Sequence, residues 1–128
     1  MNRITDEDIT RLNERQAGLV WSVTFGFASF ELECERIKSI GCCSKLGFRI
    51  DGREFLTVDD NRNLPALGWL PEARILEFRR EVDESGNQVL VIAIEGGNEI
   101  LMWVDSPEHE CITIELERHE DEIQMMIF

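Results

Sequence analysis

The sequence has no tyrosine, and its 13 basic residues are half as many as its 26 acidic residues. It also lacks a G-x-S-x-G nucleophile motif, a phosphate-binding glycine loop and a dinucleotide-binding fingerprint. Each of these motifs holds a nucleophile or a set of backbone amides where a defined reaction needs them. Their absence leaves no diagnostic sign of catalysis, and we expect a protein that is not an enzyme and uses no cofactor.

Long apolar runs are missing as well. The run VLVIAI, residues 89–94, ends after six residues, whereas a membrane-spanning helix needs about 20. The chain opens with MNRITDEDIT and has no apolar segment behind it, which is unlike a secretory signal peptide. We therefore expect a cytoplasmic protein that does not associate with a membrane.

Cysteine is present but not in a metal-binding or redox spacing. The four cysteines are Cys34, Cys42, Cys43 and Cys111. None of them forms the C-x-x-C pair of zinc knuckles and thioredoxin-like sites. Because disulfides are rare in a reducing cytosol, we expect small buried thiols.

The rest of the composition is typical of one folded domain. The chain has 128 residues, of which 43% are hydrophobic and 30% are charged. That length is sufficient to bury one core of ordinary size, and the composition is that of a globular chain. We expect residues 1–128 to form a single domain.

The negative charge is concentrated towards the C-terminus. The formal net charge is −13, and residues 105–128 contain eight acidic residues but only one basic residue, Arg118. A field of this sign repels phosphate backbones, so we expect no nucleic-acid binding. It speeds encounter with a basic protein, although the same charge would also serve solubility alone.

The N-terminal residues 4–18 predict one helix. Thr5 is a natural N-cap and Asp8 stands in the capping-box position, with Asp replacing the usual Glu. Ile4 and Ile9 have the spacing of a hydrophobic staple. Gly18 is a plausible residue to end the helix.

From Leu19 onwards the apolar residues recur every second position. One face holds Trp21, Val23, Phe25 and Phe27. The phase then shifts, so that Phe30, Leu32 and Cys34 alternate with Glu31, Glu33 and Glu35. Such a shift needs an extra residue or a reversal, which predicts a bulge or tight turn near Gly26–Ser29.

The middle of the chain is less regular. Residues 39–47 predict a loop, and residues 45–58 predict a hairpin that turns at Asp51-Gly52. Residues 59–71 are rich in Asn, Pro and Gly and hold Trp69, so we expect an irregular stretch that partly packs onto the body. Residues 72–82 fit either a helix or a strand. We favour a strand because a turn and another strand follow at once.

The C-terminal half predicts about five short strands joined by tight turns, which permit only antiparallel neighbours. VLVIAI is apolar on both faces, which is typical of a central strand covered on both sides. The predicted fold is therefore mainly β (α+β): an antiparallel meander forming a small sandwich or curled sheet, with one N-terminal helix.

The stretch SPEHECITIELERHEDE, residues 106–122, holds both histidines. On an unbroken strand His109 and His119 would lie about 33 Å apart, so they cannot share one metal ion. His109 and Cys111 would lie about 6.6 Å apart on one face, but further ligands are missing. A metal- or thiol-dependent enzyme at this pair therefore remains only an alternative hypothesis.

The carboxylates of the same stretch offer a second interpretation. Crowding like charges on one strand and its turns is destabilising and serves no core. The charge either protects a solvated strand near a sheet edge or provides a docking surface for a cationic protein. The candidate partner-binding residues are Glu108, Glu110, Glu115, Glu117, Glu120, Asp121 and Glu122.

In size, charge and lack of catalytic motifs, the chain resembles the small acidic immunity proteins of bacteria, which neutralise toxin domains. The resemblance implies a non-catalytic inhibitor whose acidic surface binds a basic, nuclease-like toxin domain. It identifies no binding residue, because no residue pattern carries it. The alternatives are an accessory module that binds a ligand or peptide through residues 59–71, and the enzyme described above.

Overall fold

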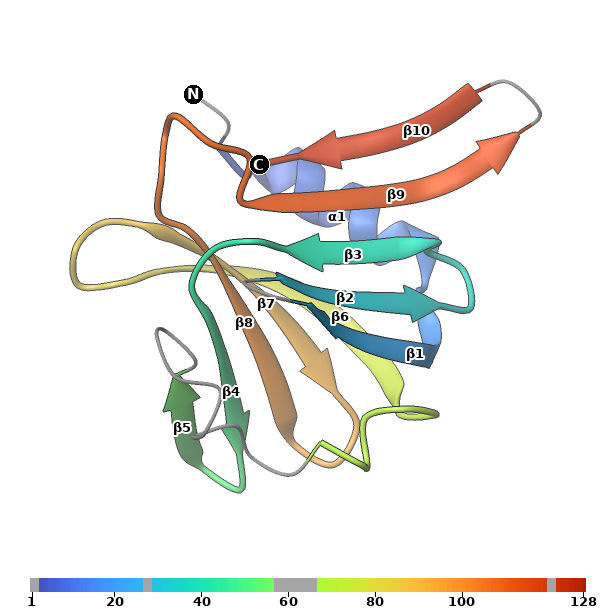
Figure 1. Cartoon of the computed structure of the whole chain (residues 1–128), viewed down its shortest axis with the longest axis horizontal. Helices are drawn as coiled ribbons and strands as arrows, with labels where there is room; N and C mark the ends of the chain where they lie inside the picture. The colour runs from blue at the N-terminus through green and yellow to red at the C-terminus, as the bar shows by residue number, and fades with distance from the viewer. Residues whose placement is uncertain (1–2, 27–28, 57–66, 120–121) are drawn as a thin grey trace.

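The computed structural model describes residues 3–26, 29–56, 67–119 and 122–128, without the side chains of residues 117–119 and 122–123. One helix precedes a sheet of ten strands (Figure 1). The first elements are α1 (Asp6–Arg15), β1 (Gly18–Gly26), β2 (Ser29–Cys34), β3 (Ser39–Cys42), β4 (Leu46–Ile50) and β5 (Arg53–Leu56). The later strands are β6 (Arg74–Val82), β7 (Gln88–Ile94), β8 (Asn98–Val104), β9 (Ile112–His119) and β10 (Glu122–Ile127).

The sheet order is β10-β9-β3-β2-β1-β6-β7-β8-β4-β5, and all the described pairs are antiparallel. Strand β1 joins two halves, because Gly18 and Leu19 pair with β6 whereas residues 20–26 pair with β2. We call β10-β9-β3-β2-β1 the first half-sheet and β6-β7-β8-β4-β5 the second. Their strands cross in Figure 1, and the end strands β10 and β5 do not meet.

The core lies between the two half-sheets. In β2, Phe30, Leu32 and Cys34 are buried while the residues between them are exposed. Phe30 meets Phe48 of β4 edge-to-face, with ring centroids 5.8 Å apart. Such aromatic contacts add to the hydrophobic gain from burial. The predicted mainly-β fold, a curled antiparallel sheet with one N-terminal helix, is confirmed.

Helix α1 packs beside β6, along the part of β6 that extends past the start of β1. Thr5 caps it, and the predicted capping box is present: the Asp8 amide donates to the Thr5 hydroxyl, and the Thr5 amide donates to the Asp8 carboxylate. The side-chain amide of Asn13 bonds both backbone groups of Phe78, at 3.0 Å and 2.7 Å. The helix ends at Gln16, with φ at 51°, so the prediction that Gly18 ends it is wrong. Gly18 begins β1 instead.

Several local predictions are confirmed. The Asp51-Gly52 turn closes the β4–β5 hairpin, with both residues at positive φ as a tight hairpin turn requires. Residues 74–82 form a strand, and Gly26 pairs with Ser29 at the expected reversal. Leu70 is buried and Trp69 packs against the core, so the described end of the 59–71 stretch folds onto the body. Residues 59–66 lie outside the described part of the chain.

Two predictions are corrected. Residues 39–47 are not a loop, because they contain β3 and the start of β4. Strand β3 is only four residues long and contains Gly41, so its sequence resembles a turn, but β2 and β9 pair with it on both sides. The predicted C-terminal meander, in which each strand pairs with the next, is interrupted between β8 and β9. Strand β8 pairs with β4, and β9 crosses to pair with β3.

No helix in the described ranges combines the length and the apolar character that crossing a bilayer requires.

Candidate functional site

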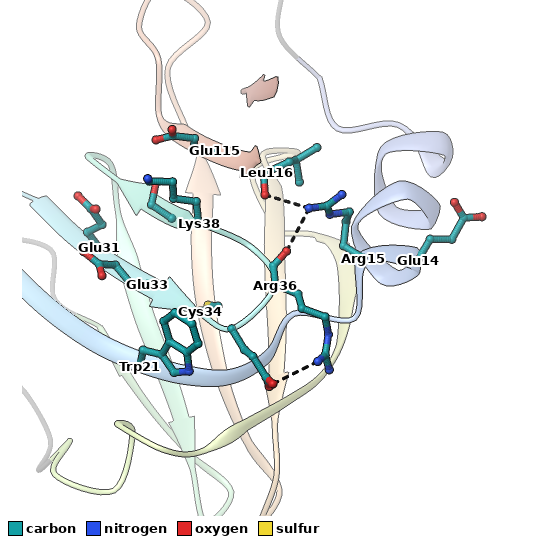
Figure 2. A pocket seen from close by; sticks show the side chains of 12 residues that line it. Glu14, Arg15, Trp21, Glu31, Glu33, Cys34, Arg36, Lys38, Glu115 and Leu116 are labelled. Atoms are coloured by element: carbon teal, nitrogen blue, oxygen red, sulfur yellow. Dashed lines mark hydrogen bonds and ion pairs between the residues drawn. The ribbon is translucent and has the colours of Figure 1, made fainter. Parts of the chain in front are cut away.

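The outward face of the first half-sheet is hollowed by an open groove of about 840 Å³, which we call the β2 groove (Figure 2). Strands β1, β2, β3 and β9 form it together with the end of α1. Its lining residues are Glu14, Arg15, Trp21, Glu31, Glu33, Cys34, Glu35, Arg36, Lys38, Ser39, Glu115 and Leu116. The volume is within the range of small-ligand pockets, and the open shape also suits a protruding segment of another protein.

Strand alternation places the carboxylates of this groove. Because Phe30, Leu32 and Cys34 face the core, Glu31 and Glu33 face outwards. Glu31 pairs with Gly41 of β3, which has no side chain to fill the space beside it. Ser39 of β3 pairs with Glu115 of β9. Carboxylates from two non-neighbouring strands therefore border one concave surface, separated by small residues.

A β-bulge places Trp21 on the same surface. Val20 pairs with Cys34 and Ser22 pairs with Glu33, so Trp21 is an extra residue between two pairs. Val20 and Val23 face the core, whereas the Trp21 side chain is 62% exposed. A bulge redirects a side chain in this way. The predicted common face of Trp21 with Val23 and Phe25 is therefore wrong.

Two of the three cations in the groove are held by backbone carbonyls. Arg15 donates to the carbonyls of Leu116 and Arg36, at 3.1 Å and 3.3 Å. Arg36 donates to the carbonyl of Gln16 at 2.6 Å and forms an ion pair with Glu35 at 3.3 Å. The Glu35 carboxylate also accepts a hydrogen bond from the Leu19 amide. The side chains of Arg15, Arg36 and Glu35 thus connect the end of α1 to strands β1 and β9 and to the residues directly after β2 through hydrogen bonds.

Glu31 and Glu33 differ from Glu35. Both are exposed, and within the described ranges neither forms an ion pair. Lys38 also lines the groove and is exposed, without an ion pair to any described residue. Figure 2 shows Glu31, Glu33 and Lys38 on the same side of the sheet as Trp21. The groove therefore offers two carboxylates that have no ion-pair partner among the described residues, beside one lysine and an exposed indole.

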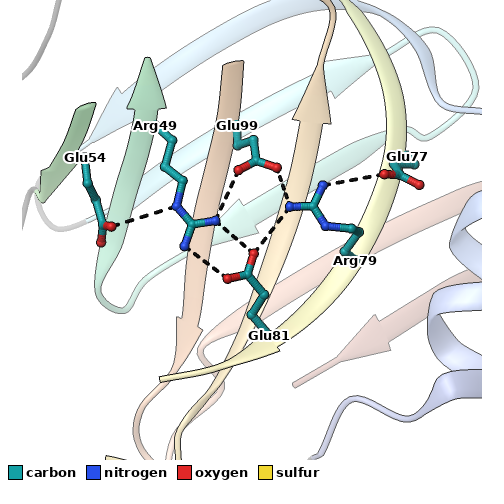
Figure 3. A network of polar contacts seen from close by, with 6 residues as sticks. All are labelled: Arg49, Glu54, Glu77, Arg79, Glu81 and Glu99. Carbon is teal, nitrogen blue, oxygen red and sulfur yellow. Dashed lines mark hydrogen bonds and ion pairs between the residues drawn. The ribbon is translucent and has the colours of Figure 1, made fainter. Parts of the chain in front are cut away.

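The outward face of the second half-sheet shows the opposite arrangement (Figure 3). Arg49 bonds Glu81 at 2.8 Å and Glu99 at 3.1 Å, and it approaches Glu54 at 3.8 Å. Arg79 pairs with Glu77, Glu81 and Glu99. The hydrogen bonds from Arg49 lower the pKa of Glu81 below its ordinary value. Every carboxylate drawn in Figure 3 is matched by an arginine.

An apolar cluster on the same face explains this network. Val89, Val91, Leu101 and Trp103 are buried on the side of β7 and β8 that faces away from the main core. Lys45 lies over the Trp103 ring at 4.4 Å from its centroid. Long basic side chains can cover apolar surface while their charged ends stay in water. The prediction that VLVIAI is covered on both faces is confirmed, and the charges on this side have a structural role.

The structure separates the candidate residues that the sequence grouped together. Glu115 is half-buried and lines the β2 groove. Glu108 and Glu110 are exposed in the loop between β8 and β9 and do not line it. Glu117 and Glu122 belong to strands β9 and β10, but their side chains are not among those described. Glu120 and Asp121 lie outside the described residues.

At the histidine–cysteine pair, the thiol contacts backbone atoms of the loop between β8 and β9. The Cys111 thiol is buried and donates to the backbone carbonyls of His109, at 3.5 Å, and Ser106, at 3.6 Å. His109 is exposed. In the described ranges, no group of three or more His, Cys, Asp and Glu side chains is arranged to hold a metal ion.

Glu31 and Glu33 were not among the candidate residues, although their alternation with buried residues predicts that they face outwards. Their position close to Glu115 depends on β3, which lies between β2 and β9 and whose sequence resembles a loop. The bulge that exposes Trp21 breaks the alternation and has no sequence signal of its own.

Comparison of the chain with protein-family models, with curated proteins and with solved structures finds no match.

Proposed function

We propose that this chain is a non-catalytic inhibitor that binds a basic protein partner through the β2 groove. In this proposal the partner is a toxin domain, and the chain acts as a bacterial immunity protein in the cytoplasm. The class resemblance in size and charge motivates the toxin partner, and the groove supplies the surface. The proposed contact residues are Glu31, Glu33 and Glu115, with Trp21 at the edge of the groove.

The observation that carries the proposal is the difference between the two outward faces. On the second half-sheet, Arg49 and Arg79 compensate the carboxylates around them. On the first half-sheet, Glu31 and Glu33 have no such partner among the described residues. Uncompensated like charges on one sheet face are unfavourable for the isolated fold. A cationic partner would relieve that repulsion on binding.

A nuclease-like toxin is the partner class that this chemistry suits best. Nucleases attract phosphate backbones with lysine and arginine, and those residues must stay accessible. A concave acidic surface can occupy such a site, with carboxylates forming charge-assisted hydrogen bonds to the cations. The net charge of −13 would speed the encounter, most strongly at low ionic strength.

Co-expression tests this function. The chain should restore growth to cells that produce the basic toxin-like product of a neighbouring gene. Replacing both carboxylates, Glu31→Lys with Glu33→Lys, should abolish protection and weaken the purified complex at least 100-fold, because two attractive contacts become repulsive.

The matched control is Glu84→Lys with Glu108→Lys, which changes the net charge by the same amount. Glu84 is exposed in the turn before β7 and Glu108 in the loop between β8 and β9, and neither residue lines the groove. This variant should still protect cells and bind within a few-fold of the wild type. Equal loss in both variants would show a general charge effect, and full protection by the groove variant would refute the proposed surface.

A further inference from the structure

We infer that the β2 groove selects arginine over lysine, binding an extended segment that carries arginines at alternate positions, with one guanidinium stacked on Trp21. This inference rests on the proposed function, because it names the chemistry that the partner presents to the same groove. It commits the groove to a cationic protein segment.

The bulge in β1 is the first observation behind it. A regular strand would alternate through Val20, Trp21, Ser22 and Val23, and one of the two valines would then face outwards. The extra residue lets both valines face the core and leaves the indole 62% exposed. Exposing a tryptophan is costly in hydrophobic energy, so an indole held outwards beside a groove is a feature of binding surfaces.

The second observation is that the indole is not already covered. In the described part of the chain, the cation lying over an aromatic ring is Lys45, and that ring is Trp103. The groove cations Arg15 and Arg36 donate to backbone carbonyls, and the third cation, Lys38, makes no ring contact in the described part of the chain. An incoming cation would therefore find the Trp21 face available.

The third observation is the spacing of the carboxylates. Glu31 and Glu33 lie two residues apart on one strand and face the same way, so their positions are separated by about 6.6 Å along β2. An extended segment with cations at every second residue repeats at the same distance. Glu33 also pairs directly with Ser22, the neighbour of Trp21. A cation bonded to Glu33 would thus lie within reach of the indole.

Arginine suits this arrangement better than lysine. The guanidinium is planar, donates to a carboxylate through two parallel hydrogen bonds and stacks on an aromatic ring through its flat face. The lysine ammonium is a strongly hydrated point charge, and it cannot combine these contacts in one plane. The groove should therefore distinguish two ligands that have the same net charge.

Two blocked nine-residue peptides, in which glycine alternates with arginine or with lysine, provide the test. Their dissociation constants are measured at low ionic strength against the full chain. We expect the arginine peptide to bind about fivefold more tightly than the lysine peptide, because the guanidinium combines stacking on the ring with two parallel hydrogen bonds, whereas both peptides share the charge attraction. In Trp21→Leu this preference should fall to less than twofold, whereas Trp21→Phe should retain part of it.

Leu76→Ala is the control, because Leu76 is 61% exposed and does not line the groove. It should leave both affinities unchanged, and circular dichroism checks the fold of each variant. Equal binding of the two peptides by the wild type, or a preference that survives in Trp21→Leu, would overturn the inference.

A second pair of changes separates this inference from the proposed function. Glu31→Gln with Glu33→Gln should weaken both peptides. If it does so while arginine and lysine bind alike, the groove is still a cationic docking site and only the arginine selection is refuted. If neither peptide is weakened, both the inference and the proposed groove are refuted.

Discussion

At the scale of single residues, burial decides which of the four thiols can react. Cys34, Cys42 and Cys111 are buried, and only Cys43 is exposed. Burial, assisted by the nearby charge of Glu33, raises the pKa of Cys34 to about 12. Since the thiolate is the reactive form, Cys34 should be unreactive near neutral pH. The prediction of buried thiols is therefore confirmed for three of the cysteines and is wrong for Cys43, which is exposed.

Thiol titration checks this assignment. With an aromatic disulfide reagent near pH 8, one thiol should react quickly in the native protein and three more only after unfolding. Cys43→Ser should remove the fast reaction. The unfolded variant should then react at three thiols in total, one fewer than the wild type. Two or more fast thiols in the native wild type would contradict the burial of the other cysteines.

At the scale of elements, the clearest single link is between α1 and β6. Asn13 forms hydrogen bonds with both backbone groups of Phe78, on a part of the β6 edge that β1 does not reach. Buried or half-buried backbone groups are costly when they lose their partners. The side chain of Asn13 thus replaces the missing strand neighbour at this position.

Asn13→Ala should lower the free energy of unfolding by about 1–3 kcal/mol, because two backbone groups lose their hydrogen bonds. Alanine has the higher intrinsic helix propensity, so the helix alone would predict a small gain. Urea denaturation measures the difference. The control Glu14→Gln, an exposed change one position along the same helix, should stay within about 0.5 kcal/mol of the wild type. A neutral or stabilising Asn13→Ala would refute the role of this contact.

Much of the element structure could be predicted from the sequence where local chemistry decides it. The capping box at Thr5, the Asp51-Gly52 turn and the two-sided burial of VLVIAI each depend on residues close together in the chain. Strand β3 could not be predicted in this way. Its four residues become a strand only because β2 and β9, distant in sequence, supply hydrogen-bonding partners on both sides.

The same limit applies to the groove. The outward orientation of Glu31 and Glu33 follows from alternation, but their position near Glu115 follows from the pairing of β3 with β9. The acidic stretch 106–122 supplied all the candidate residues because its carboxylates are close together in the sequence. The structure places only Glu115 of the described candidates in the groove, and the larger contribution comes from β2.

At the scale of the whole molecule, the charge is divided between two faces with different roles. On the second half-sheet, acidic and basic side chains compensate one another above an apolar cluster. On the first half-sheet, negative charge is left exposed around a hollow surface. A protein that needed negative charge only for solubility would have no reason to keep these two arrangements apart.

The location of a bound cationic segment is the most direct test of this account. Backbone amide resonances of the isotopically labelled chain are followed by NMR while the alternating arginine peptide is added at low ionic strength. The account predicts that the largest shifts occur at Trp21, Glu31, Glu33 and Glu115, while those of Arg79 and Glu81 stay near their starting positions. Largest shifts on the second half-sheet, or shifts spread evenly over both faces, would contradict it.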